Sequence, residues 1–281
     1  MGPKVKREMI SDSGAPTPLA HYCQGVVVGD YVYAAGQIAS DYRNGVAPEA
    51  RVAAEFPYYG SEIQRQTHYI LENLRKTFRA AGTDLENVVK AQVFLTDLTD
   101  FFYFDQVWKK FFPSPPPRTT VGVTGLLVPG CKVEIDLIAV KPGAKRTVIS
   151  DSGVPTPLAH YCQGVVVGDH VYAAGQIASD YRNGVAPEAR VAAEFPYYGS
   201  EIQRQTHYIL ENLRKTFRAA GTDLENVVKA QVFLTNLTDF FYFDQVWKKF
   251  FPSPPPRTTV GVTGLLVPGC KVEIDLIAIK P

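Results

Sequence analysis

An arginine on a stiff segment has the clearest potential for ligand chemistry in this chain. Arg118 directly follows the run Pro113-Ser114-Pro115-Pro116-Pro117, and each proline in that run locks its own φ angle. A guanidinium delivered in this way is preorganised to bind a carboxylate through two parallel hydrogen bonds, which lysine cannot do as well. The alternative interpretation is a surface arginine paired with a neighbouring acid.

A glutamate in an apolar segment could supply acid–base chemistry. Glu134 and Asp136 alternate with apolar residues near the end of the first half of the chain, which places both acids on one face of a strand. A carboxylate with a tuned pKa can act there as a general acid or base; the alternative is a solvated strand face. Asp105 is a further candidate, because close to Arg118 it would repel a substrate carboxylate or raise its own pKa, unless it contacts a substrate amine.

Other reactive residue types lack the partners that their chemistry needs. Gly36, just before Gln37-Ile38, fits a close backbone approach to a ligand, but a glycine at a strand end is also ordinary. Cys23 is expected to be inert packing rather than a nucleophile. His21 and His68 have no matching acid, and the four cysteines include no C-x-x-C pair. We therefore expect no catalytic triad and no metal site.

Each of these residues has a counterpart, because the chain contains two nearly identical copies of one unit. Residues 3–141 match residues 142–280 at a constant offset of 139. The eight differences are Lys4/Gly143, Val5/Ala144, Glu8/Thr147, Met9/Val148, Ala15/Val154, Tyr31/His170, Asp97/Asn236 and Val140/Ile279. A period of this length is far too long for a solenoid repeat. Each copy is therefore expected to be a whole domain, residues 1–141 and 142–281.

The apolar periodicity of one copy predicts the elements that hold these residues. In chain order they are a hairpin of strands at 23–28 and 31–35, a helix at 61–81, a strand at 88–95, a helix at 100–112 and closing strands at 118–123 and 132–140, with a short strand before Ile10. Ser61 and Gln64 form a predicted capping box, and Gly82 is a predicted helix stop. Residues 37–60, which hold Gly, Pro and mixed charges, are expected to be a long loop.

The order of these elements predicts the fold class. A β-β-α-β-α-β-β unit is an α+β domain, here with two helices covering one face of a mixed sheet. The other face of such a sheet then needs a cover. Small domains often obtain that cover by self-association, so we expect the domains of this chain to associate with one another.

Composition and charge exclude several classes of protein. With 29 basic and 28 acidic side chains the formal charge is +1, so the basic excess typical of nucleic-acid-binding proteins is missing. No stretch approaches 18 uninterrupted apolar residues, and the first ten residues contain no apolar h-region. Neither a membrane span nor a secretory signal is therefore expected. Together with the few cysteines, these features predict a cytoplasmic protein without nucleic-acid or membrane partners.

Five short stretches, taken in order, resemble the RidA/YjgF family, the enamine/imine deaminases. They are Ala20-His21-Tyr22-Cys23-Gln24-Gly25, Ala35-Gly36-Gln37-Ile38, Val93-Phe94-Leu95-Thr96-Asp97, Pro117-Arg118-Thr119-Thr120-Val121 and Val133-Glu134-Ile135-Asp136. The resemblance covers nearly all of each copy. It implies the chorismate-mutase-like α+β fold and a homotrimer with sites in the clefts between neighbouring domains.

The resemblance also implies a role for each matching residue, once in each copy. Arg118 and Arg257 anchor the substrate carboxylate, Glu134 and Glu273 position or activate the attacking water, and Tyr22 and Tyr161 line the cleft. We also expect Gly36 and Gly175, and the aspartates Asp105 and Asp244 that depart from the family pattern, among the substrate-binding residues. For Tyr22 the alternative is a core or interface aromatic, since the chain holds 15 tyrosines.

This chain departs from the family pattern at several positions. Asp105 and Asp244 stand where many members carry asparagine, Thr120 stands where cysteine is frequent, and Ala35 stands where serine is frequent. The loop with Phe56-Pro57-Tyr58-Tyr59-Gly60 is longer than expected and would either wall off a site for a larger substrate or pack locally. These departures bear on the choice of substrate more than on the fold.

The implied activity is hydrolysis of an enamine or imine derived from an amino acid, which releases ammonia and a 2-keto acid without a cofactor. The resemblance also admits aminomuconate-like substrates. A different class of function stays open, namely a non-catalytic module that binds a small carboxylate. Ribonuclease activity, sometimes attributed to the family, is a third possibility, and the near-neutral charge argues against it.

Overall fold

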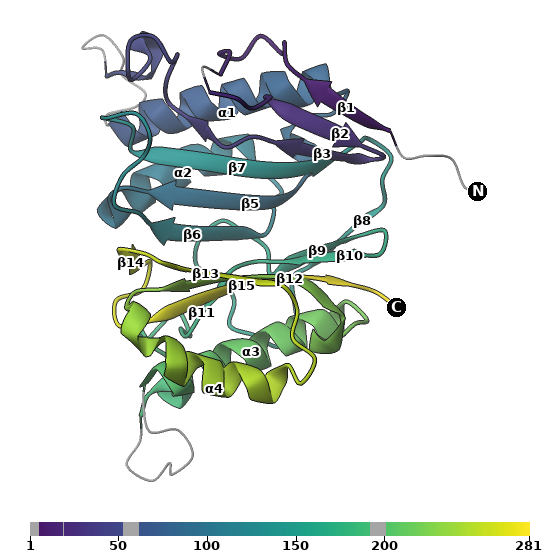
Figure 1. The fold of residues 1–281 in the computed structure, drawn as a ribbon, viewed down its shortest axis with the longest axis vertical. Helices are drawn as coiled ribbons and strands as arrows, with labels where there is room; N and C mark the ends of the chain where they lie inside the picture. The colour runs from purple at the N-terminus through teal and green to yellow at the C-terminus, as the bar shows by residue number, and fades with distance from the viewer. Residues whose placement is uncertain (1–5, 19, 53–61, 192–200) are drawn as a thin grey trace. The chain divides into compact units, whose positions relative to one another are not determined.

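The computed structural model describes residues 6–18, 20–52, 62–191 and 201–281 (Figure 1). Contacts divide the chain into two compact units. Unit 1 comprises Met1–Pro116 and Val123–Lys145, and unit 2 comprises Pro117–Gly122 and Arg146–Pro281. The short segment Pro117–Gly122, which carries Arg118, therefore packs as part of unit 2 although its sequence belongs to the first copy.

Unit 1 contains an antiparallel sheet with the strand order β1-β2-β3-β7-β5. The strands are β1 (Arg7–Ile10), β2 (Gly25–Val28), β3 (Tyr31–Ala34), β5 (Val88–Leu95) and β7 (Val133–Val140), and the short β4 (Gln37–Ile38) pairs with β7. The helices are α1 (Glu62–Ala80) and α2 (Phe101–Phe111), with 3-10 turns η1 (Pro48–Ala50), η2 (Leu85–Asn87) and η3 (Leu98–Asp100).

Unit 2 repeats this arrangement with the strand order β13-β12-β15-β10-β9-β8. The strands are β8 (Arg146–Ile149), β9 (Gly164–Val167), β10 (His170–Ala173), β12 (Val227–Leu234), β13 (Arg257–Gly261) and β15 (Val272–Ile279), with β11 (Gln176–Ile177) on β15. The helices are α3 (Glu201–Ala219) and α4 (Phe240–Phe250), with η4 (Pro187–Ala189), η5 (Leu224–Asn226) and η6 (Leu237–Asp239). Strands β12 and β13 run parallel, so the sheet is mixed. Unit 2 also pairs β6 (Arg118–Gly122) with β14 (Gly264–Leu265).

The two helices of each unit cover one face of its sheet, which confirms the predicted α+β architecture (Figure 1). Helix α1 packs its predicted apolar stripe, Ile63, Ile70, Leu74 and Phe78, into the core of unit 1, where all four are fully buried. Burial of such side chains is the main favourable term in folding. The stripe therefore fixes which face of the sheet the helix covers.

The alternation along β7 decides where the acids lie. Val133, Ile135 and Leu137 belong to the same core cluster as the α1 stripe. Successive side chains of a strand point to opposite faces, so Glu134 and Asp136 lie on the face away from α1. The predicted alternation of this strand is confirmed, and the same argument applies to Glu273 on β15, whose neighbours Val272 and Ile274 are fully buried.

Most predicted boundaries agree with the structure to within two residues, but the segment 37–60 differs. It was expected to be a loop throughout, whereas it contains β4 and η1. Gly82 does end α1: its φ is +76°, and the Thr83 amide donates to the Phe78 carbonyl at 3.0 Å. Ser61 of the predicted capping box and the aromatic segment 56–60 lie outside the described residues. Among the helices that are described, none is both long and apolar enough to cross a membrane.

Candidate active site

Glu273 and Gly175 make the closest approach at the site in unit 2. Gly175 directly precedes β11, which pairs with β15 and so passes beside Glu273. A Cβ atom added to Gly175 would overlap the Glu273 carboxylate oxygen and would lie 2.7 Å from the Thr119 hydroxyl. Only a residue without a side chain leaves room for a buried carboxylate here. The structure therefore brings together the predicted glycine and the predicted glutamate.

The segment Pro117–Gly122 adds an arginine to this cluster. Arg118 is buried, and its guanidinium carbon lies 5.8 Å from the centre of the Tyr161 ring. The neighbouring Thr119 hydroxyl donates to an Asp275 carboxylate oxygen at 2.9 Å, which anchors the segment to β15. Unit 2 thus holds a guanidinium, a phenol and two carboxylates within one cluster.

A second tyrosine completes the cluster. The Tyr161 and Tyr181 hydroxyls lie 2.7 Å apart. Burial, with a smaller contribution from the Glu273 carboxylate, raises the pKa of Tyr161 to about 12. The hydrogen bond from Tyr181 and the charge of Arg118 oppose this rise. Burial also raises the pKa of Tyr181 well above its ordinary value. Both phenols are therefore neutral hydrogen-bonding groups near neutral pH and cannot act as bases.

Tyr181 reaches this position through an unusual backbone conformation that the sequence analysis missed. Its φ is +60°, in the left-handed region that non-glycine residues rarely adopt. The Tyr181 amide donates to the Ser179 hydroxyl at 2.9 Å, and this hydroxyl donates to the Gly184 carbonyl at 2.6 Å. Asp180 follows the pattern of an Asx turn, which is the one local signal for such a conformation. Strain of this kind gathers at functional sites.

Cysteine and histidine side chains do not supply the chemistry of this cluster. Burial and the nearby Glu273 raise the pKa of the Cys270 thiol to about 12, so it stays protonated. The His207 ring packs edge-on against Phe250 at 5.3 Å between centres, on the helix side. The described part of the chain contains no group of three His, Cys, Asp or Glu side chains that could hold a metal. The predicted inert role of Cys23, which is half-buried and lies at a different position, stays a prediction.

Unit 1 contains the matching half of the site. The Tyr22 hydroxyl donates to the Tyr42 hydroxyl at 3.0 Å, and a Cβ on Gly36 would overlap the Glu134 carboxylate. Burial raises the pKa of Glu134. Burial, with repulsion from Glu134, raises the pKa of Asp136 to about 6. Tyr22 is 41% exposed.

Arg257 is held within unit 2 by Asp244, an aspartate at one of the positions where this chain departs from the family pattern. Its guanidinium pairs with Asp244 at 3.0 Å, and Lys248 pairs with the same carboxylate at 2.9 Å. The guanidinium carbon also lies 4.9 to 5.4 Å from the ring centres of three α4 side chains, Phe240, Phe243 and Trp247. Burial favours a higher pKa for Asp244, but the hydrogen bonds from Lys248 and Arg257 outweigh it and lower the pKa.

This ion pair shows the effect of an acidic side chain beside Arg257. The expectation that it raises its own pKa is wrong for Asp244. The carboxylate is charged and orients the Arg257 fork. In unit 1 the counterpart Asp105 is buried and pairs with Lys109 at 3.2 Å. Contact of either aspartate with a substrate stays a prediction.

Comparison with known proteins gives one family for both copies. A family model described as endoribonuclease L-PSP matches residues 13–141 and again residues 152–280. A RutC family protein of Saccharolobus solfataricus is 37% identical over 136 residues, which are 48% of this chain and 98% of that protein. The 2-iminobutanoate/2-iminopropanoate deaminase of Rattus norvegicus is 33% identical over 137 residues, 49% of this chain and 92% of that protein. Among solved structures, E. coli TdcF with bound serine is 29% identical, covers 48% of this chain and 99% of its own, and has a TM-score of 0.40.

Proposed function

The chain belongs to the endoribonuclease L-PSP family, and on this premise we propose that it is a hydrolytic deaminase of 2-imino acids. The predicted RidA/YjgF resemblance is confirmed by this membership. The observation that carries the proposal is the cluster in unit 2, where Arg118 lies over Tyr161 and the Glu273 carboxylate lies against Gly175. A candidate carboxylate anchor and a candidate general base, both buried, then belong to one cluster.

Binding in this proposal depends on the arginine fork. The substrate carboxylate accepts two hydrogen bonds from Arg118, a geometry that fixes both position and orientation. The Tyr161 hydroxyl, neutral at the working pH, is a hydrogen-bond donor at the wall of the site. Gly175 leaves room for the Glu273 carboxylate and the Thr119 hydroxyl. Holding the reacting carbon in this way supplies most of the catalysis by positioning.

The reaction then needs one proton acceptor. The imine reacts in its protonated form. The water oxygen bonds to the imine carbon while the Glu273 carboxylate takes one of the water protons, which gives a neutral carbinolamine. Glu273 then returns that proton to the amine nitrogen, the carbon–nitrogen bond breaks as the hydroxyl oxygen forms the carbonyl, and the hydroxyl proton passes to the departing ammonia. An imino acid and water thus give a 2-keto acid and ammonia, with the glutamate unchanged.

The relatives support this class of substrate. The rat protein, 33% identical, is named for 2-iminobutanoate and 2-iminopropanoate, and small imino acids of this kind are our first candidates. An aminomuconate-like compound is the second, because the sequence predicts a longer aromatic loop. The alternative of a non-catalytic module predicts carboxylate binding without turnover. RNA cleavage is disfavoured by the formal charge of +1.

An imine-loss assay tests the proposal. An amino-acid oxidase generates 2-iminopropionate or iminobutyrate in place, and the protein is expected to accelerate the loss of imine. The Arg118→Ala, Arg257→Ala double variant should lose that acceleration, and a 2-keto acid should bind it much more weakly. Carboxylate binding without any acceleration by the wild-type protein would instead establish the binding module.

A further inference from the structure

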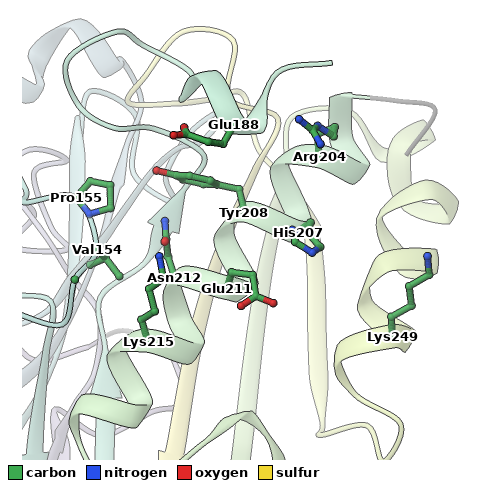
Figure 2. A pocket seen from close by; sticks show the side chains of 11 residues that line it. Val154, Pro155, Glu188, Arg204, His207, Tyr208, Glu211, Asn212, Lys215 and Lys249 are labelled. Carbon is green, nitrogen blue, oxygen red and sulfur yellow. The ribbon is translucent and has the colours of Figure 1, made fainter. Parts of the chain in front are cut away.

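A second concave site lies along the first helix of each unit. In unit 2 it is a groove of about 1000 Å³ between α3, η4 and the segment 153–155 (Figure 2). Unit 1 carries an equivalent groove of about 1070 Å³, lined by α1, η1 and the segment 14–17. The lining shares no residue with the clusters around Glu134 and Glu273. The groove is therefore a separate site that occurs twice per chain.

Four polar side chains follow one another along one side of the groove. Glu188 lies at one end and Lys215 at the other, with Tyr208 and Asn212 between them (Figure 2). Tyr208, Asn212 and Lys215 share one face of α3 because they are spaced by four and three residues. Within this row of four, opposite charges stand at the two ends, with a phenol and an amide in the middle. The lining also includes Arg204, and Glu211, whose carboxylate pairs with Arg214 at 2.7 Å.

The amide in the middle is a buried donor that needs an acceptor. Asn212 is 3% exposed and Asn73, its counterpart in unit 1, is 2% exposed, and in both the amide nitrogen has no acceptor in full hydrogen-bond geometry. The neighbouring phenol, Tyr208 or Tyr69, is an acceptor for one of the two N–H groups of the amide, which leaves the other N–H without one. In unit 1 the Lys76 ammonium donates to the Asn73 amide oxygen at 3.1 Å, which identifies the other side of the amide as the donor. Native structures seldom leave such a donor unsatisfied, so an acceptor from outside the chain is expected at this point.

The phenol beside the amide is a donor as well. Burial raises the pKa of Tyr208, the Asn212 amide opposes the rise, and the Glu188 carboxylate adds to it. The hydroxyl therefore stays protonated near neutral pH. An acceptor group placed here meets an amide, a phenol and an ammonium, while the far end of the groove presents a carboxylate. This arrangement is complementary to a molecule that is negative at one end and positive at the other.

We propose that the groove binds a small zwitterion, either a free amino acid or a short peptide. Its carboxylate accepts hydrogen bonds from Asn212 and Lys215, and its ammonium group donates to Glu188. In unit 1 the same roles fall to Asn73, Lys76 and Glu49.

The two grooves differ at one wall position. One of the eight differences between the copies places Ala15 in unit 1 where unit 2 has Val154, and both side chains line their grooves. Valine is the larger, so the unit 2 groove is expected to accept smaller ligand side chains. Two affinity classes per chain follow from this difference.

Calorimetric titration of the full chain tests the proposal. The probes are L-alanine and L-alanyl-L-alanine, with acetate and ethylammonium chloride as single-charge controls. The Arg118→Ala, Arg257→Ala background removes binding at the candidate active site. In that background the Asn73→Leu, Asn212→Leu pair deletes the amide donor at similar side-chain size and should weaken zwitterion binding by about 10-fold or more. The Glu49→Gln, Glu188→Gln pair should weaken both zwitterions but not acetate.

Each outcome decides the question. Zwitterion binding that survives in the arginine background and falls in both variant pairs supports the site. The probe that binds more tightly, alanine or the dipeptide, then shows whether the ligand is a free amino acid or a short peptide. If the leucine pair fails to fold by circular dichroism, the glutamine pair carries the test, because Glu49 and Glu188 are exposed. Absence of binding by every probe, or equal binding in all variants, means that water alone completes the amide and overturns the proposal.

Discussion

At the scale of single residues, the proposed hydrolysis rests on the carboxylates of Glu134 and Glu273. Replacing both with glutamine removes the proton acceptor while preserving shape. We expect turnover in the imine-loss assay to fall by roughly 10²- to 10⁴-fold, the range typical of general acid–base catalysis. Binding of a 2-keto acid, measured by calorimetry, should stay largely intact because the arginines remain. Unchanged turnover would place the base elsewhere, and Asp105 would be the next candidate.

Gly175 tests how closely the backbone must approach that carboxylate. In Gly175→Ala the added methyl would overlap the Glu273 carboxylate and crowd Thr119. The carboxylate must move, so we expect kcat/KM at this site to fall by about 10²-fold, with a stability loss of about 1–3 kcal/mol. Gly125→Ala is the matched control, because a methyl there meets nothing within 4 Å. Equal kinetics in the two variants would remove Gly175 from the site.

Asp136 should make stability depend on pH. Its pKa is raised to about 6 by burial and by Glu134, above the value of about 3.9 in an unfolded chain. The folded state therefore binds the proton more tightly, and stability falls as the pH rises from about 4 to about 6. Asp136→Asn removes this fall, so the variant should exceed the wild type by up to about 3 kcal/mol at pH 7 and match it near pH 4. Thermal unfolding at the two pH values measures the difference, and a pH-independent difference would contradict the assignment.

At the scale of elements, the proline run before β6 is expected to set the position of Arg118. Replacing Pro115, Pro116 and Pro117 with alanine frees the segment in the unbound protein, so more entropy is lost on binding. We expect KM for the imine to rise by about 10-fold with little change in kcat. Pro142→Ala, in an exposed part of the join between the copies, is the control and should change neither. A fall in kcat with unchanged KM would show that the run serves folding rather than ligand binding.

The elements themselves were largely predictable, because their apolar patterns are long and regular. Strand β5 has the predicted bounds, and α1 ends at the glycine that signals its end. Strand β4 was missed because its two residues pair with β7, which follows almost a hundred residues later. No local pattern encodes such a contact. Turn η1 was missed because the segment around it shows no apolar periodicity.

The site was predictable in its residue types but not in its geometry. The family resemblance pointed to Arg118, Glu273 and Gly175, which the structure brings into one unit. Tyr181 was missed because its side chain reaches the cluster only through a left-handed backbone. The hydrogen bond from the Thr119 hydroxyl to Asp275 was missed because it depends on which unit the segment 117–122 packs with. Sequence spacing carries no information on that choice.

At the scale of the whole molecule, the two units differ in which of the candidate site residues lie together. Unit 2 contains Arg118 beside Tyr161, whereas Tyr22 in unit 1 is 41% exposed. Arg257 is held by Asp244. We propose that the Glu134 half receives Arg257 from another chain. On this proposal, the two copies give one site within the chain and one that depends on association.

We predict that three chains assemble. The family resemblance implies rings of three domains, each chain carries two, and three chains supply the six domains of two rings; closed symmetric assemblies are the usual outcome. Light scattering should give roughly three times the 31.0 kDa chain mass. The Arg118→Ala variant keeps only sites that another chain completes, so dilution should lower its turnover per chain. The Arg257→Ala variant keeps the site within the chain, so dilution should leave its turnover per chain unchanged. A clean monomer or dimer, or equal dilution behaviour of the two variants, would contradict the assembly, because the Glu134 half would then have no arginine to receive.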